Sequence, residues 1–265
     1  MILAASPWWS TVPALGAALG YLLLALANSR MPRPSAGALM ALVWLLHALA
    51  LGMALGAQPA RFGFAPALSV MAWLVFTVHA IESRLYPQLH TRRALAALGA
   101  GAVLLALVFP GSDYPDLRSN WLPLHWALGI AAYGLLAVAV VHAWFMQRAE
   151  KSIRQGAPQG EVTLPLLALE RLTFRFVAAG FVLLTGTLLA GWYFTELLGP
   201  HGWAWTHKTV FTVLSWAVLG LLLLGRWQWG WRGRFAVRML YAGAALLLLG
   251  YVGTRFVIEV VLQRS

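Results

Sequence analysis

The sequence predicts an all-α integral membrane protein, folded as a bundle of about eight transmembrane helices. Of its 265 residues, 61% are hydrophobic and only 10% are charged, whereas a soluble domain carries about 25% charged residues. Apolar runs of membrane length also alternate with short basic clusters. A soluble protein of this composition would expose extensive apolar surface, so we expect the excess to face a lipid bilayer.

Each span needs about 20 mostly apolar residues, and each should be helical because lipid does not tolerate unpaired backbone polar groups. The predicted spans are 8–28, 36–57, 62–81, 94–110, 121–146, 174–194, 209–225 and 236–252, all within a single integral membrane domain over residues 1–265. We expect the first run to be a retained span, because no basic residue precedes Arg30 as a signal peptide would require.

Two connections can also be predicted. The longest loop should cover residues 147–172 and include a flexible connector over residues 151–158. The last span should continue past the bilayer as a helix through Arg255 and Glu259, which lie four residues apart and therefore share a face.

The basic residues predict the orientation. Of the 19 lysines and arginines, 14 fall in one set of loops and 5 in the other. The positive-inside rule places the larger set in the cytoplasm, which puts both termini and the loops near residues 58–61, 111–120 and 195–208 outside. Topology control explains the net charge of +11 better than nucleic acid does, because the charges form no continuous patch.

Two predicted outer segments place histidines among tryptophans at the membrane boundary: Ser119–Trp126 and His201–Lys208. The plainer interpretation is anchoring, since tryptophan is enriched at membrane interfaces. The other is a haem site, because imidazole is a common axial ligand of haem iron. In an extended loop Trp203, Trp205 and His207 would point the same way, and the indoles could pack on a porphyrin. Lys208 or Arg118 could pair with a haem propionate.

The motifs resemble a known family. Ser-Asn-Trp-Leu-Pro-Leu-His125 is similar to the segment that carries the first periplasmic histidine in cytochrome c assembly proteins of the CcsA/ResC type. Trp203-Ala-Trp-Thr-His-Lys208, followed by an apolar span containing Trp216, resembles that family's tryptophan-rich "WWD" signature. The resemblance is closer to the short eight-span YpjD/HemX-like branch, whose ending is similar to residues 251–261. It covers most of residues 115–262.

The resemblance implies a multi-pass protein of the bacterial inner (plasma) membrane that binds haem b and handles or chaperones it at the outer face. It also implies partners besides the lipid bilayer, namely other cytochrome c assembly membrane proteins or apocytochrome c. His125 carries over directly. Thr206 stands at the family's aspartate, and no histidine stands near residues 224–226 or 252–255, where the family has its intramembrane histidine and its second periplasmic histidine.

The second iron ligand is our own inference. His207 is the candidate because it lies two residues from Trp205, and His201 is the reserve. The predicted haem site comprises His125 and His207 as iron ligands with Trp121, Trp126, Trp203, Trp205 and Lys208 around them.

Two other functions stay open on sequence alone: a membrane regulatory or stabilising subunit without haem, and a small-molecule or ion transporter. Transporters often show internal repeats and polar residues at mid-membrane, and neither stands out here. No self-contained catalytic motif is present and the chain has no cysteine, so we assign no catalytic residue.

The remaining histidines have separate predictions. His47, within the second span, is a functional candidate by position, although we favour a neutral histidine bonded to a neighbouring helix. His79 and His142, toward the cytoplasmic ends of their spans, could form a second haem or metal site, and their Cα atoms would then lie within about 10–13 Å. His90 is expected to be solvated.

Overall fold

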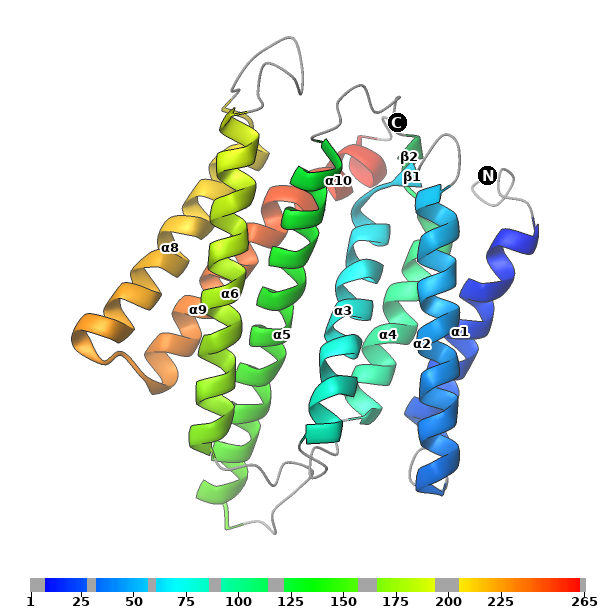
Figure 1. Ribbon diagram of the computed structural model, residues 1–265, viewed down its shortest axis with the longest axis horizontal. Coiled ribbons are helices and arrows are strands. Elements are labelled where there is room, and N and C mark those ends of the chain that lie inside the picture. Colours follow the sequence, from blue (N-terminus) through cyan, green and yellow to red (C-terminus); the bar gives the residue numbers. More distant parts are fainter. Residues whose placement is uncertain are drawn as a thin grey trace. The chain divides into compact units, whose positions relative to one another are not determined.

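The computed structural model describes residues 8–27, 32–56, 61–85, 92–113, 122–156, 166–193 and 205–262. These residues are almost entirely helical (Figure 1). The chain forms two compact units: unit 1 contains residues 1–116 and 255–265, and unit 2 contains residues 117–254.

The described part of residues 1–116 in unit 1 contains the helices α1 (Trp8–Ala27), α2 (Arg33–Gly56), α3 (Phe64–Leu85) and α4 (Arg92–Val108). Helix α1 packs against α2 and α4, and α3 packs against the same two helices. Two short strands, β1 (Arg61–Phe62) and β2 (Ser112–Asp113), pair antiparallel and join the segment before α3 to the segment after α4. This pairing could not be predicted from sequence, because it links two short segments far apart in the chain.

Unit 2 contains α5 (Leu122–Arg154), α6 (Leu166–Tyr193), α8 (His207–Trp229) and α9 (Gly233–Leu248). Helices α5 and α6 form one closely packed pair, and α8 and α9 form another. Gly180 permits the first approach: a Cβ there would lie 2.9 Å from Leu136 Cγ. Small residues at helix interfaces in membranes serve this purpose.

The chain continues beyond α9 without leaving a helical conformation. A π-helix, η1 (Leu249–Gly253), leads into α10 (Thr254–Phe256) and a second π-helix, η2 (Val257–Val261). The predicted continuation through Arg255 and Glu259 is therefore confirmed. The π-helical geometry was not predicted, because no residue pattern distinguishes it from an ordinary α-helix.

The structure confirms the predicted fold class. Among the residues that the structure describes, six helices are long and apolar enough to cross a membrane: Pro34–Gly56, Phe64–Glu82, Leu124–Arg154, Leu166–Tyr193, His207–Trp229 and Gly233–Val261. Thr11–Leu26 and Arg93–Val108 are shorter apolar helices. Helix α4 has 17 residues, the lower limit of a range of roughly 17–25 for spans. Exposed side chains such as Leu19 and Leu167, 62% and 70% exposed, fit a lipid-facing surface.

The predicted loop over residues 147–172 is wrong at both ends. Helix α5 runs to Arg154 and α6 begins at Leu166, so Lys151 to Arg154 are helical rather than a flexible connector. Hydropathy marks only the part of a helix that lies in hydrocarbon, whereas Gln, Glu, Lys and Arg are good helix formers in a polar environment. An ion pair between Glu150 and Arg154, four residues apart, also supports this last turn.

Candidate functional site

The described parts of the two predicted histidine segments, residues 122–126 and 205–208, lie at the same end of unit 2. The first turns of α5 and α8 and the last turn of α6 lie at this end (Figure 1). We call it the His125 end, after the only histidine that the family resemblance carries over. The residues that define it are His125, Lys208 and Tyr251 with their side chains and Thr187 with its backbone.

His125 stands in the first turn of α5 and is half-buried. Its ring makes a hydrogen bond with the backbone of Thr187 on α6, whereas Nδ1 is buried and has no hydrogen-bond partner in the described part of the chain. The bond to Thr187 therefore engages Nε2. A neutral imidazole that donates one N–H to a backbone carbonyl keeps a lone pair on its other nitrogen, as metal-ligating histidines do.

Lys208 brings a positive charge to the same place. It lies in the first turn of α8, near enough to His125 for its charge to act on the imidazole. Its Nζ atom is 5.3 Å from the centroid of the Tyr251 ring in η1, within the range of a cation–π contact. The π-helical η1 thus borders the site, and π-bulges often occur at functional sites. Sequence reasoning missed Thr187 and Tyr251, which carry no motif of their own.

The start of α8 is fixed by Thr206. This residue is the N-cap, and its hydroxyl accepts a hydrogen bond from the Thr209 N–H at 3.4 Å. Aspartate and threonine are both preferred N-caps, so threonine can perform this structural task at the family's aspartate position. The neighbouring Trp205 is 69% exposed, and His207 is also exposed.

The Lys208 charge acts on the His125 imidazole, but the described segments show no hydrogen bond or ring contact between His125 and His207. The pairing of these histidines on one iron stays a prediction. Trp126 is half-buried beside His125. The other predicted residues at this end, Trp121, Trp203 and His201, lie outside the described residues, as does His90 in its predicted loop.

Trp216, the tryptophan of the span after the signature, holds α8 against α6. Its indole N–H donates to Thr185 Oγ1 at 2.9 Å. Its ring stacks on Phe181 with centroids 5.7 Å apart and an interplanar angle of 19°. We therefore assign Trp216 to helix packing rather than to the ligand surface.

His47 lies in the core of unit 1 with both ring nitrogens bonded. Nδ1 is 3.1 Å from the Tyr21 hydroxyl and Nε2 is 2.9 Å from Ser69 Oγ. These partners lie on α1 and α3, as expected for a histidine bonded to neighbouring helices. His79 belongs to unit 1 and His142 to unit 2, so their approach stays a prediction. The described residues hold no group of three or more metal-ligating side chains.

At the other end of unit 2, an ion pair occupies the region where the resemblance places the family's intramembrane histidine. Arg226 donates to Glu170 at 2.6 Å, and its guanidinium lies 3.7 Å from the centroid of the Phe174 ring. Arg232 approaches the same carboxylate at 4.0 Å. These ion pairs join α6 to α8, and the chain has Arg226 in the region where the resemblance expects a histidine.

Comparison with known proteins places this arrangement in a family. The family model described as cytochrome C assembly protein matches residues 34–262, from α2 to the end of the last helix. The chain belongs to the cytochrome c assembly protein family. The match includes His125, Thr206 and Lys208, and it extends the resemblance seen in residues 115–262 to most of unit 1.

Comparisons with individual proteins support this family assignment. The chain is 29% identical to the inner membrane protein YpjD of Escherichia coli strain K12 over 203 residues, which is 73% of each chain. It is 24% identical to the cytochrome c biogenesis protein CcsA of Synechococcus strain CC9902 over 216 residues, covering 70% of this chain and 71% of the relative. An uncharacterized 28.8 kDa protein of Azospirillum brasilense is 35% identical over 149 residues, 54% of this chain and 53% of that protein. No solved structure gives a significant match.

Proposed function

We propose that this chain is an inner-membrane protein of cytochrome c biogenesis that binds haem at the outer face and holds it for a partner. The observation that carries the proposal is the His125 imidazole, with Nδ1 buried and unbonded in the described structure and with Lys208 close by. A buried polar atom without a partner costs roughly 1–3 kcal/mol, so a ligand that satisfies it stabilises the bound state.

The residues at the His125 end fit haem b in kind. Haem supplies an iron that takes an imidazole nitrogen and two propionates that take cations. His125 would provide the nitrogen and Lys208 the cation. Trp205, which is mostly exposed just before the start of α8, would offer an indole face to the porphyrin. Trp126, Trp121 and Trp203 are the other proposed neighbours of the ring. His207 is the proposed second ligand, because it stands beside Lys208 at the start of α8.

A handling role suits the chain better than catalysis. The cytochrome c biogenesis protein CcsA is one of its relatives, and the sequence shows no self-contained catalytic motif. We therefore propose that the chain presents haem to apocytochrome c or to another membrane protein of the assembly pathway. The relation to an inner membrane protein supports the same location here.

The test of haem binding is spectral. Full-length protein purified with haem should show a Soret band, and His125→Ala should lower haem occupancy and shift that band. His207→Ala should change the spectrum if this residue is the second ligand. His90→Ala, in a predicted solvated loop, is the matched control and should leave the spectrum unchanged. A His125→Ala protein with wild-type spectrum and stoichiometry would sink the assignment of His125, even if haem bound elsewhere.

Action at the outer face has its own test. Reporter fusions after Lys151 and Arg232 should report the cytoplasm, whereas fusions after Arg61 and Pro200 should report the outside, because the larger set of basic residues stays inside. An exported signal at residue 151 would contradict the proposed side of the His125 end without bearing on haem binding itself.

A further inference from the structure

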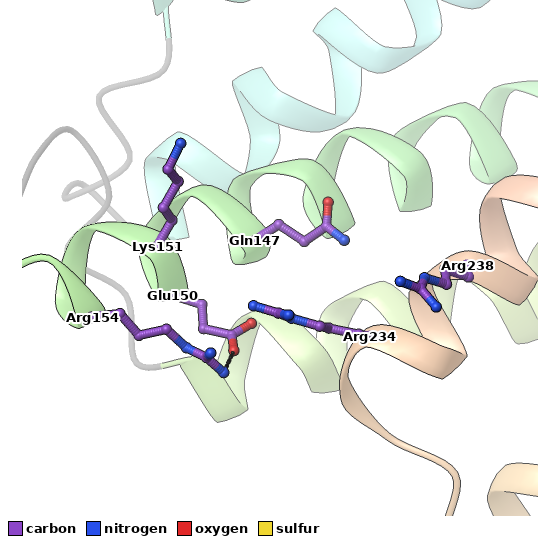
Figure 2. A pocket seen from close by; sticks show the side chains of 6 residues that line it. All are labelled: Gln147, Glu150, Lys151, Arg154, Arg234 and Arg238. Carbon is purple, nitrogen blue, oxygen red and sulfur yellow. Dashed lines mark hydrogen bonds and ion pairs between the residues drawn. The ribbon is translucent and has the colours of Figure 1, made fainter.

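A second candidate site lies at the opposite end of unit 2, between α5 and α9. A cavity of about 340 Å³ is lined by six polar side chains: Gln147, Glu150, Lys151, Arg154, Arg234 and Arg238. Figure 2 shows Arg234 and Arg238 extending from α9 toward Gln147 and Glu150 on α5. We propose that this cavity binds the phosphate of an anionic phospholipid headgroup.

The charges in the cavity are unbalanced. Four cations face one carboxylate, that of Glu150, and this carboxylate is already paired with Arg154. Gln147 is engaged as well, since its Oε1 accepts a hydrogen bond from the Tyr241 hydroxyl at 3.2 Å. Lys151, Arg234 and Arg238 line the same cavity with no further carboxylate among its lining residues. An anion from outside the chain would offset this excess, and arginine suits phosphate because it can donate two parallel hydrogen bonds.

The position of the two arginines in α9 strengthens the argument. Arg234 and Arg238 are four residues apart, so they share a face and repel each other. They also occupy the first turns of the helix, where the backbone dipole is positive and cations are unfavourable. No acidic residue stands in the first turn, and Arg232 at the N-cap makes no side-chain capping bond. In the protein alone, the repulsion between these arginines and the helix dipole destabilises the fold. A bound phosphate would turn both positive charges into favourable partners.

The surroundings favour a lipid over a free phosphate ion. The cavity lies between the last turns of the candidate span Leu124–Arg154 and the first turns of the candidate span Gly233–Val261, and the ends of membrane spans lie at the level of lipid headgroups. Phe235, next to Arg234, is 51% exposed, and Trp144 on α5 is 40% exposed. Basic pockets between membrane helices are known to hold anionic headgroups, and these exposed rings could lie against acyl chains.

The experiment compares lipids by native mass spectrometry of the full chain in detergent. Wild-type protein should retain added cardiolipin or phosphatidylglycerol and should not retain phosphatidylcholine. The double variant Arg234→Gln/Arg238→Gln should bind the anionic lipids roughly thirtyfold more weakly, given about 1 kcal/mol for each basic residue at a headgroup. Arg171→Gln/Arg175→Gln removes the same charge from α6, outside the cavity, and should bind within about twofold of wild type.

Other outcomes would overturn the proposal. Equal losses in both double variants would mean that total charge, not the cavity, attracts the lipid. Binding of inorganic phosphate or pyrophosphate without preference for anionic lipid would assign the cavity to a soluble anion. If the first double variant loses its helical circular dichroism, Lys151→Gln takes its place, and unchanged lipid retention by that folded variant would likewise contradict the assignment.

Discussion

Two histidines, one in each unit, differ in how their ring nitrogens are hydrogen-bonded. His47 in unit 1 is fully buried, and both of its nitrogens have hydroxyl partners. His125 in unit 2 is only half-buried, yet its Nδ1 is enclosed without a partner in the described residues. Burial alone would rank His47 above His125 as a ligand-binding candidate, whereas unsatisfied hydrogen-bonding capacity favours His125, in line with the proposed haem site.

The cluster around His47 is also interlocked by packing. The Tyr21 ring meets Phe76 edge-on, with centroids 5.0 Å apart. A Cβ at Gly99 would lie 2.9 Å from Tyr21 Cζ, so α4 leaves room for this ring only because it has glycine there. Around His125, by contrast, Thr187 and Lys208 come from α6 and α8, and Tyr251, whose ring lies under the Lys208 ammonium, comes from η1. A site assembled from helix ends can adjust to a ligand more readily than a locked core.

The largest effect should come from His47→Leu. The change leaves the Tyr21 and Ser69 hydroxyls buried without this partner, at roughly 1–3 kcal/mol each. We expect about 2–5 kcal/mol of destabilisation, measured as unfolding in mixed detergent micelles. The triple variant Tyr21→Phe/His47→Leu/Ser69→Ala removes all three polar groups and should recover most of this loss. A single variant as stable as wild type would show that the two hydrogen bonds of His47 do not contribute to the free energy of unfolding.

The same reasoning indicates what sequence could reveal. Hydropathy located the apolar parts of the helices because lipid imposes length and composition on each span. It also showed that His47 lies within a span, but not that α1 and α3 bring Tyr21 and Ser69 to its two nitrogens. Such contacts depend on how helices pack, and the linear pattern does not encode that. The strand pairing of Arg61 with Asp113 was missed for the same reason.

Only some residues of the candidate site could be predicted from the sequence. The sequence indicated His125 by its neighbours and Lys208 as a counter-charge for a haem propionate, and both roles stay predictions. The structure adds that the Lys208 charge acts on the His125 imidazole. The role of Thr187 could not be predicted, because this residue contributes a backbone group that any residue could supply. The end of α5 was misplaced at residue 146 because its charged last turns were taken to mark a loop, whereas polar residues continue a helix well outside hydrocarbon.

A middle-sized effect should follow from Arg226→Met. His47 and His125 differ both in hydrogen bonding and in the unit to which they belong. Arg226 and Glu170 form a hydrogen-bonded pair within unit 2, so this variant shows what the loss of a bonded partner costs in the same unit as His125. Both side chains are partly exposed, 24% and 15%, so we expect a loss of about 1–2 kcal/mol. Arg226→Met combined with Glu170→Leu should restore part of it. An unfolding midpoint that stays at the wild-type value in the single variant would mean that Arg232, 4.0 Å from the same carboxylate, compensates fully.

The smallest effect on stability should come from His125→Leu in the haem-free protein. The substitution removes a buried nitrogen that has no partner and loses one hydrogen bond to the Thr187 backbone. These contributions oppose each other and should leave the free energy of unfolding within about 1 kcal/mol of wild type. The same variant should lose the stabilisation that added haem gives the wild-type protein, because a ligand stabilises only the state that binds it. If His125→Leu without haem costs as much as His47→Leu, the unbonded nitrogen is no sign of a ligand, and the two histidines are equally structural.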